Sequence, residues 1–166
     1  MNLIQHYING KIASGDSSRK GKVFNPATGN QESEVLLGSK SDLDKAVEYA
    51  KKAFLTWSTT PPIQRARIIF KYKELIEKHS DEITKLIVSE HGKVYEDAKG
   101  SLTRGLEVVE FACGIPQMLK GEFTENVGTN IDSWSIRQPL GVCAGITPFN
   151  FPAMVPMWMF PMAIAC

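Results

Sequence analysis

Asn150 is the residue whose type and position most directly suggest chemistry. It lies in Thr147-Pro148-Phe149-Asn150-Phe151-Pro152, within a stretch from Gln138 to Cys166 that has no Asp, Glu, Lys, Arg or His. A buried amide in such a segment needs hydrogen-bond partners. At the carboxyl end of a strand, where ligands bind in open α/β sheets, the amide could donate to a developing oxyanion. The alternative is a turn asparagine that bonds its own backbone, and the spacing leaves both interpretations open.

The cysteines and histidines form no recognisable nucleophile or metal site. Cys113 falls on an apolar helix face, Cys143 in a predicted buried strand and Cys166 in an apolar run. All three are therefore expected to be small core residues. The histidines, at positions 6, 79 and 91, lack the spacing of metal ligands, so we predict no metal site. Neither common glycine-rich phosphate-binding motif is present.

A strand and a helix are expected on either side of Asn150. Residues 140–146 are small and apolar without alternation, which predicts a strand buried on both faces of a parallel sheet. An apolar helix should begin near Pro152 or Ala153. Strand, tight turn and helix in this order are typical of a nucleotide-binding crossover unit.

Upstream, the predicted elements change from strands to helices. Short strands are expected within residues 3–38, where Asn9-Gly10 is a hairpin signal. Helical periodicity then predicts four helices. The first helix is expected to be capped by Ser41, with Asp44 as its capping-box partner, and the second to start at Pro61-Pro62. The third should run from Ser80 to Gly92 and the fourth from about Glu96 to Cys113.

Two further patterns concern the surface. The basic cluster Arg65, Arg67, Lys71 and Lys73 is expected to be the solvated face of the second helix. Residues 133–137 alternate polar and apolar side chains, which predicts a half-exposed strand.

The composition excludes several classes of protein. The chain has 166 residues, of which 43% are hydrophobic, and its net charge is +1. This balance excludes a strongly basic nucleic-acid binder and a disordered acidic chain. Prolines interrupt the apolar stretch after residue 138, so we expect no membrane helix. Three cysteines and no secretory signal predict a reducing, cytoplasmic setting. The apolar run at the end has no helix stop signal, so we expect a fragment.

Several of these motifs resemble the aldehyde dehydrogenase superfamily. Pro139-Leu140-Gly141-Val142 followed by residues 146–152 is similar to the family's characteristic strand and loop. The longer run over residues 149–163 resembles the acylating methylmalonate-semialdehyde dehydrogenase branch. Four upstream segments agree with this resemblance: residues 7–11, 25–28, 90–93 and 104–110. The resemblance covers essentially the whole chain, but only the N-terminal part of a family-length protein.

The resemblance implies an α/β fold, namely the N-terminal portion of the aldehyde dehydrogenase fold. Residues 1–124 and 138–166 would form part of a Rossmann-like NAD-binding domain, residues 125–137 a strand of the oligomerisation hairpin, and the catalytic domain would be absent. Asn150 would be the oxyanion asparagine, and Arg104 would bind the substrate carboxylate instead of being a surface arginine. The residues implied at the NAD site are Ile146, Thr147, Pro148 and Phe149.

The implied reaction is the NAD-dependent oxidation of methylmalonate or malonate semialdehyde through a cysteine thioester. Coenzyme A takes the acyl group as propionyl-CoA or acetyl-CoA, and the substrate carboxylate is lost. The nucleophilic cysteine of the family is not among the three here, so the chain alone is expected to be inactive. The expected partners are the small semialdehyde and further copies of the protein, as a homodimer or homotetramer. The alternatives are a hydrolysing aldehyde dehydrogenase and a non-catalytic module that associates with other chains.

Overall fold

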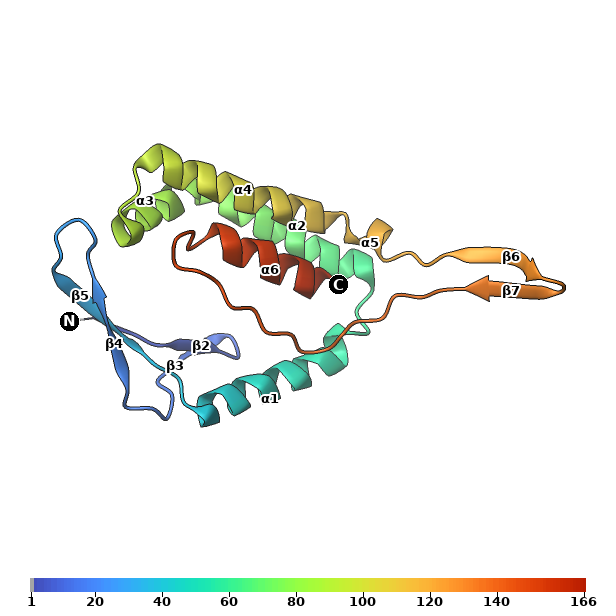
Figure 1. Cartoon of the computed structure of the whole chain (residues 1–166), viewed down its shortest axis with the longest axis horizontal. Helices are drawn as coiled ribbons and strands as arrows, with labels where there is room; N and C mark the ends of the chain where they lie inside the picture. The colour runs from blue at the N-terminus through green and yellow to red at the C-terminus, as the bar shows by residue number, and fades with distance from the viewer. Residues whose placement is uncertain (1) are drawn as a thin grey trace.

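The computed structural model describes residues 2–166 and shows an α/β arrangement with strands at one end, packed helices in the middle and a hairpin at the other end (Figure 1). The α/β class expected from the sequence is thereby confirmed. At the strand end, β5 (Gln31–Leu36) is the centre of a three-stranded sheet. It pairs in parallel with β1 (Asn2–Ile4) and antiparallel with β4 (Lys20–Phe24).

The Asn9-Gly10 hairpin signal is confirmed. Strands β2 (His6–Ile8) and β3 (Lys11–Ala13) pair antiparallel, with His6 opposite Ala13. Asn9 and Gly10 turn the chain between them with φ values of 54° and 72°. Both values lie in the left-handed region, which asparagine and glycine tolerate better than other residues and which two-residue hairpins require.

Helix α1 (Lys40–Trp57) begins before the predicted start, because Ser39 caps it instead of Ser41. The Ser39 hydroxyl accepts a hydrogen bond from the Asp42 N–H at 3.2 Å, and the Asp42 carboxylate accepts one from the Ser39 N–H at 2.8 Å. The same carboxylate accepts the Asp16 N–H at 2.8 Å. Ser41 instead donates to the Asp16 carboxylate. The earlier capping box is favoured because Asp42 also binds the loop that carries Asp16.

Four longer helices form the packed middle of the molecule, close to the limits predicted. They are α2 (Pro62–Lys78), α3 (Ser80–His91), α4 (Tyr95–Cys113) and α6 (Met154–Ala165), and the short α5 (Ile115–Met118) follows α4. Gly92 ends α3 with a φ of 81°, as a left-handed C-cap does. Each of the helices α2, α3, α4, α5 and α6 contributes residues to the buried core. Among these residues are Ala66, Ala98, Leu102, Val109 and Met157.

Arg65 corrects the expectation of a wholly solvated basic face on α2. It is buried, its Nε donates to the Ala165 carbonyl at 2.9 Å, and its guanidinium also donates to the Thr60 carbonyl. Since the last carbonyls of a helix have no partner within the helix, Arg65 satisfies the end of α6. Arg67 is exposed, as predicted.

Helices α4 and α6 pack closely at Gly105. A Cβ atom built there would clash with the Met157 side chain and lie 3.2 Å from the Met154 Cα. Next to this contact, the Trp158 indole donates to the Arg104 carbonyl at 3.3 Å. The missing side chain at residue 105 therefore sets the distance between the two helices.

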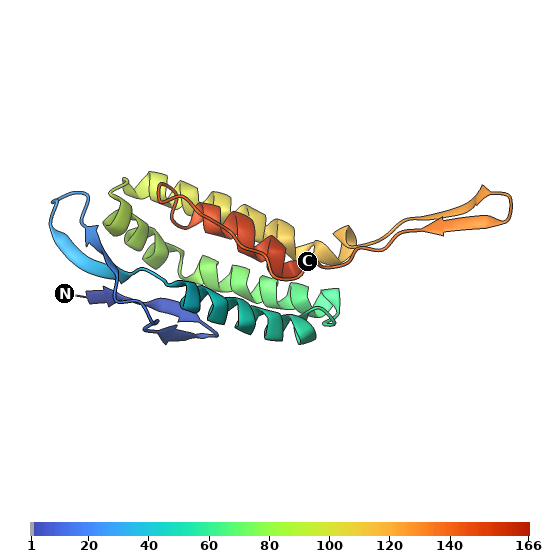
Figure 2. The same cartoon turned by 60° about the horizontal axis from the view of Figure 1, so that its bottom comes forward.

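The second hairpin, β6 (Phe123–Gly128) with β7 (Ile131–Trp134), extends away from the helices (Figure 2). It begins before the predicted boundary at residue 125, and its second strand ends before residue 137. The strand predicted over 133–137 is therefore displaced toward the N-terminus. Apolar side chains on both strands, Phe123 and Trp134 among them, are exposed.

The predicted strand over 140–146 is wrong for this chain. Residues 135–148 form an extended connection that runs back along the helices (Figure 1), and Leu140 and Ile146 are 95% and 92% exposed. Residues 136–148 make no main-chain hydrogen bond to main-chain groups of residues 2–166. A strand needs a neighbour for its N–H and C=O groups, and none of the described strands lies beside this segment.

No helix within residues 2–166 combines the length and the apolar character needed to cross a membrane.

We predict that Gly105→Ala destabilises the protein, although alanine favours helix by about 1 kcal/mol over glycine. Overpacking against Met154 and Met157 should cost about 1–3 kcal/mol in the free energy of unfolding. Gly100→Ala is the matched control on the same helix, because a Cβ there meets no atom within 4 Å. It should stabilise by about 0.5–1 kcal/mol. Urea unfolding measures both, and stabilisation by both variants would contradict the close contact.

We also predict a pH-dependent stability from Asp42, which is only 4% exposed. Hydrogen bonds from the Ser39 backbone and hydroxyl lower its pKa from 3.8 to about 2. Because the pKa is lower in the folded state, this stabilisation is complete above about pH 4 and is lost as the pH falls through about 2. Unfolding curves across this range should show a smaller pH dependence for Asp42→Asn than for the wild type. Asp44→Asn, on the exposed side of α1, should retain the wild-type slope, and equal slopes for all three would contradict the role of Asp42.

Candidate functional site

Asn150 lies in the turn that leads into α6. Its side chain is exposed and makes no hydrogen bond to the described residues, so it does not bond its own backbone as the alternative interpretation required. The preceding Phe149 is 90% exposed, and the following Phe151 is half-buried. The turn thus presents an amide with free donors beside a ring that packs against the protein.

Arg104 lies on α4 and lines a pocket of about 380 Å³. The pocket, called here the arginine pocket, is lined by Lys93, Glu96, Asp97, Gly100, Ser101, Arg104 and Phe151. The structure therefore brings Arg104 to the same pocket as the residue that follows Asn150. Within the described residues, the Arg104 guanidinium has no ion pair and no hydrogen bond. Its five donors are available to a ligand with a planar carboxylate.

Lys93 is a residue of this pocket that the sequence reasoning did not single out. It lies in the connection between α3 and α4, and its Nζ lies 3.7 Å from the centre of the Phe151 ring. This distance is well within the range of a cation–π contact. The sequence showed Lys93 only as part of the 90–93 motif, and no spacing rule relates it to residue 151.

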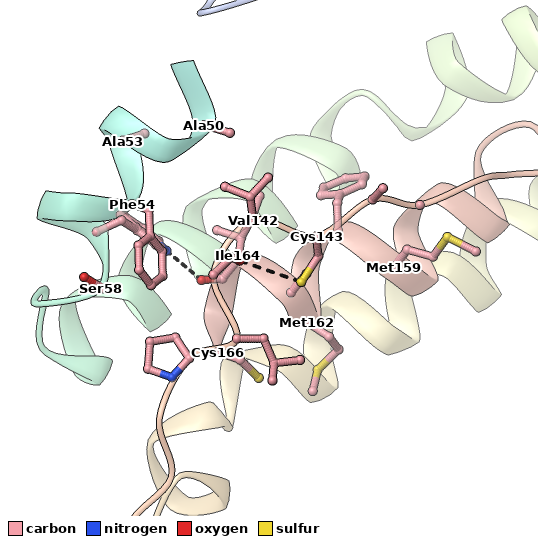
Figure 3. Close-up of a pocket in the computed structure, with 18 of the residues that line it drawn as sticks. Ala50, Ala53, Phe54, Ser58, Val142, Cys143, Met159, Met162, Ile164 and Cys166 are labelled. Carbon is pink, nitrogen blue, oxygen red and sulfur yellow. Dashed lines mark hydrogen bonds between the residues drawn. The ribbon is translucent and has the colours of Figure 1, made fainter. Parts of the chain in front are cut away.

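The residues predicted for the NAD site do not all face the same way. Thr147 lines an apolar cleft of about 900 Å³. The cleft lies between α1, α6 and the extended connection (Figure 3). Ile146, Pro148 and Phe149 are exposed and do not line it. The main-chain groups from Ile146 to Pro148 have no main-chain partner within residues 2–166 and could bind a ligand or another strand.

Only one of the three cysteines lies in the core. Cys113 is buried on α4, donates to the Val109 carbonyl at 3.4 Å, and has a pKa raised by burial, so it is a poor nucleophile. The expectation of burial is wrong for Cys143 and Cys166, which are exposed and both line the apolar cleft (Figure 3). Cys143 is uncovered because its segment has no neighbouring strand.

No group of three or more His, Cys, Asp or Glu side chains in residues 2–166 is arranged to hold a metal ion. Two histidines nevertheless have a buried ring nitrogen without a hydrogen-bond partner in this part of the chain. These atoms are Nε2 of His6 and Nδ1 of His91.

The chain is similar to enzymes that oxidise semialdehydes. It is 52% identical over 166 residues to a malonate-semialdehyde dehydrogenase of Pseudomonas aeruginosa, covering 100% of this chain and 33% of that protein. It is 50% identical over 163 residues to malonate-semialdehyde dehydrogenase 3 of Geobacillus kaustophilus, covering 98% of this chain and 34% of the relative. The chain therefore spans about a third of the length of these relatives.

Solved structures agree closely with the fold. The methylmalonate-semialdehyde dehydrogenase of Oceanimonas doudoroffii matches with a TM-score of 0.96 and 55% identity, over 100% of this chain and 34% of that one. A second match is a protein of Sinorhizobium meliloti 1021 that carries the same enzyme name and was solved in complex with NAD. Its TM-score is 0.96 at 51% identity, over 100% of this chain and 34% of that one. These matches confirm that the fold is the N-terminal portion of the aldehyde dehydrogenase fold.

The sequence profile of the aldehyde dehydrogenase family matches residues 12–166, which is nearly the whole chain. The resemblance drawn from the motifs is thus confirmed over the segment that contains Arg104 and Asn150. The chain belongs to the aldehyde dehydrogenase family.

Proposed function

We propose that the chain forms the N-terminal part of an NAD-dependent, coenzyme-A-acylating dehydrogenase of methylmalonate or malonate semialdehyde. The observation that carries this proposal is the arginine pocket, where an unpaired guanidinium lies close to the turn with the free Asn150 amide. A semialdehyde with a carboxylate needs these two groups: a cation for the carboxylate and a donor for the aldehyde oxygen. The names of the relatives support the same substrate class.

The proposed roles follow from the chemistry of each group. When a thiolate adds to the aldehyde carbon, the carbonyl electron pair moves to oxygen, and the Asn150 amide donates to the oxyanion that forms. Arg104 binds the substrate carboxylate and orients the aldehyde. Cys113 is buried, and Cys143 and Cys166 line the apolar cleft and not the arginine pocket, so we propose that the thiolate comes from another part of the enzyme.

NAD fits the chain at the turn before α6. The unpaired main-chain groups of Ile146, Thr147 and Pro148 and the exposed Phe149 are available to bind it, and the dinucleotide supplies a hydride acceptor when bound. Coenzyme A is the proposed acceptor of the acyl group. The free thiols of this chain are consistent with a reducing, cytoplasmic setting.

The exposed surfaces support a larger protein. The apolar cleft and segment 136–148, whose main-chain groups lack main-chain partners within residues 2–166, would be covered by further strands of a parallel sheet. The protruding hairpin would join subunits in a homodimer or homotetramer. An exposed hairpin with apolar side chains on both strands is typical of an interface.

The proposal can be tested with a chimera that joins residues 1–166 to the remaining part of the P. aeruginosa relative. The chimera should form NADH from malonate semialdehyde, whereas the isolated chain should not. Omitting coenzyme A distinguishes acyl transfer from hydrolysis, since a hydrolysing enzyme turns over at an undiminished rate without it. A chimera that folds and binds NAD but cannot oxidise the semialdehyde would overturn the proposal.

Asn150→Ala in the chimera should lower the single-turnover rate of acylation by about 10²–10³, because one donor to the oxyanion is lost. NAD affinity, measured by fluorescence titration, should change little. If NAD binding collapses while the acylation rate survives, Asn150 has a structural role instead.

Arg104→Ala should lower kcat/KM for malonate semialdehyde by the equivalent of about 2–4 kcal/mol, because the substrate carboxylate loses its partner. Propanal, which has no carboxylate, is the matched control, and kcat/KM for propanal should change little. Arg104→Lys should recover only part of the loss, since an ammonium lacks the planar fork of donors. Equal losses for both aldehydes would mean that Arg104 supports the fold and does not select the substrate.

A further inference from the structure

The turn that carries Asn150 has few contacts to hold it. The thirteen residues before Phe149 make no main-chain hydrogen bond to other main-chain groups of residues 2–166, and both Phe149 and Asn150 are exposed. Phe151 is the first residue of the turn that is half-buried, and its carbonyl accepts the Val155 N–H at 3.4 Å. The position of the Asn150 amide therefore depends strongly on how the neighbouring Phe151 ring is held.

Lys93 contacts that ring, and both residues line the arginine pocket. Its ammonium lies over the ring face at 3.7 Å from the centre. Glu96 and Asp97 line the same pocket, yet Lys93 forms no ion pair with them or with any other described residue. Lys93 is half-buried, which strengthens a cation–π contact because the ammonium has fewer waters around it.

The backbone directs Lys93 to this place. Gly92, which ends α3 with a φ of 81°, packs so closely that a Cβ there would lie 3.1 Å from the Pro26 side chain. The chain then turns toward α4, whose first residues line the same pocket. Lys93 is thus attached to two packed helices, whereas the turn that it contacts has no sheet to support it.

We propose that Lys93 is a positioning residue, which clamps the Phe151 ring and thereby fixes the Asn150 amide for the oxyanion. This inference rests on the proposed function and adds a residue to it. Lys93 does not bind the substrate carboxylate in this proposal, which distinguishes it from Arg104 although both cations line one pocket. Loss of the clamp should therefore affect the transition state of every aldehyde to the same extent.

The test compares Lys93→Met and Lys93→Arg in the chimera with the P. aeruginosa relative. Methionine keeps an unbranched apolar stem without the charge, and the acylation rate should fall by about 2- to 30-fold, the range that one cation–π contact is worth. The fall should be equal for malonate semialdehyde and propanal and should appear in kcat more than in KM. Arginine also binds ring faces, so Lys93→Arg should restore most of the rate.

A double-mutant cycle isolates the contact with Phe151. In a Phe151→Leu background, Lys93→Met should have no further effect on the acylation rate, because the ring is already gone. Lys99→Met is the control for removing a positive charge, since Lys99 is exposed on α4 and does not line the pocket. It should leave the rate unchanged.

Three results would overturn the clamp while the proposed function stands. They are a wild-type rate in Lys93→Met, a loss confined to the carboxylated aldehyde, and additive effects of the Lys93 and Phe151 substitutions. The proposed function fails by a different result, namely an unsubstituted chimera that folds and binds NAD without oxidising either aldehyde.

Discussion

The close contact of α4 with α6 at Gly105 is the constraint on which the candidate site depends. Arg104 is the neighbour of that glycine on α4, and the Asn150 turn leads directly into α6. The packing of the two helices therefore sets how close the Arg104 main chain lies to the start of α6, where the Asn150 turn ends. Trp158 adds a directional bond to the Arg104 carbonyl, which opposes sliding or rotation of one helix against the other. The part of the site that these two helices carry is as precise as their packing.

The far end of α6 is held by side chains from elements distant in the sequence. Arg65 on α2 binds the carbonyl of Ala165, and Trp57 at the end of α1 donates to that of Ile164 at 2.8 Å. An apolar helix with no charged residue has no cation of its own to satisfy its last carbonyls. This explains why a buried arginine is tolerated within the helical core, where an unpaired charge would be costly.

The chain also carries two features that are costly in water, an apolar cleft and an extended segment with unpaired main-chain groups. Both lie on the same side of α6, and Cys143 and Thr147 from the segment line the cleft. A sheet placed there would bury the cleft and pair the segment at once, as the buried faces of parallel sheets require. This physical complementarity agrees with the observation that the chain spans about a third of its relatives.

The amino-acid sequence by itself determined the local elements and the family. Periodicity, glycine and proline positions and capping residues are local signals, and they predicted the β2–β3 hairpin and helices α2, α3 and α4 close to their observed limits. The motifs around Asn150 and Arg104 were sufficient to identify the aldehyde dehydrogenase family. The cap of α1 is an exception: the sequence predicted Ser41, whereas Ser39 caps the helix, because the choice depends on a hydrogen bond from distant Asp16 to Asp42.

Only the tertiary structure decided which residues meet and which are covered. It buried Arg65 against α6 and left residues 140–146 without a strand partner. It also placed Lys93 over Phe151 in the pocket of Arg104. The physical reason is that hydrogen-bond satisfaction and ring contacts of this kind join residues far apart in the chain. Residue type and spacing describe what a segment can form, whereas its neighbours in space decide whether it does.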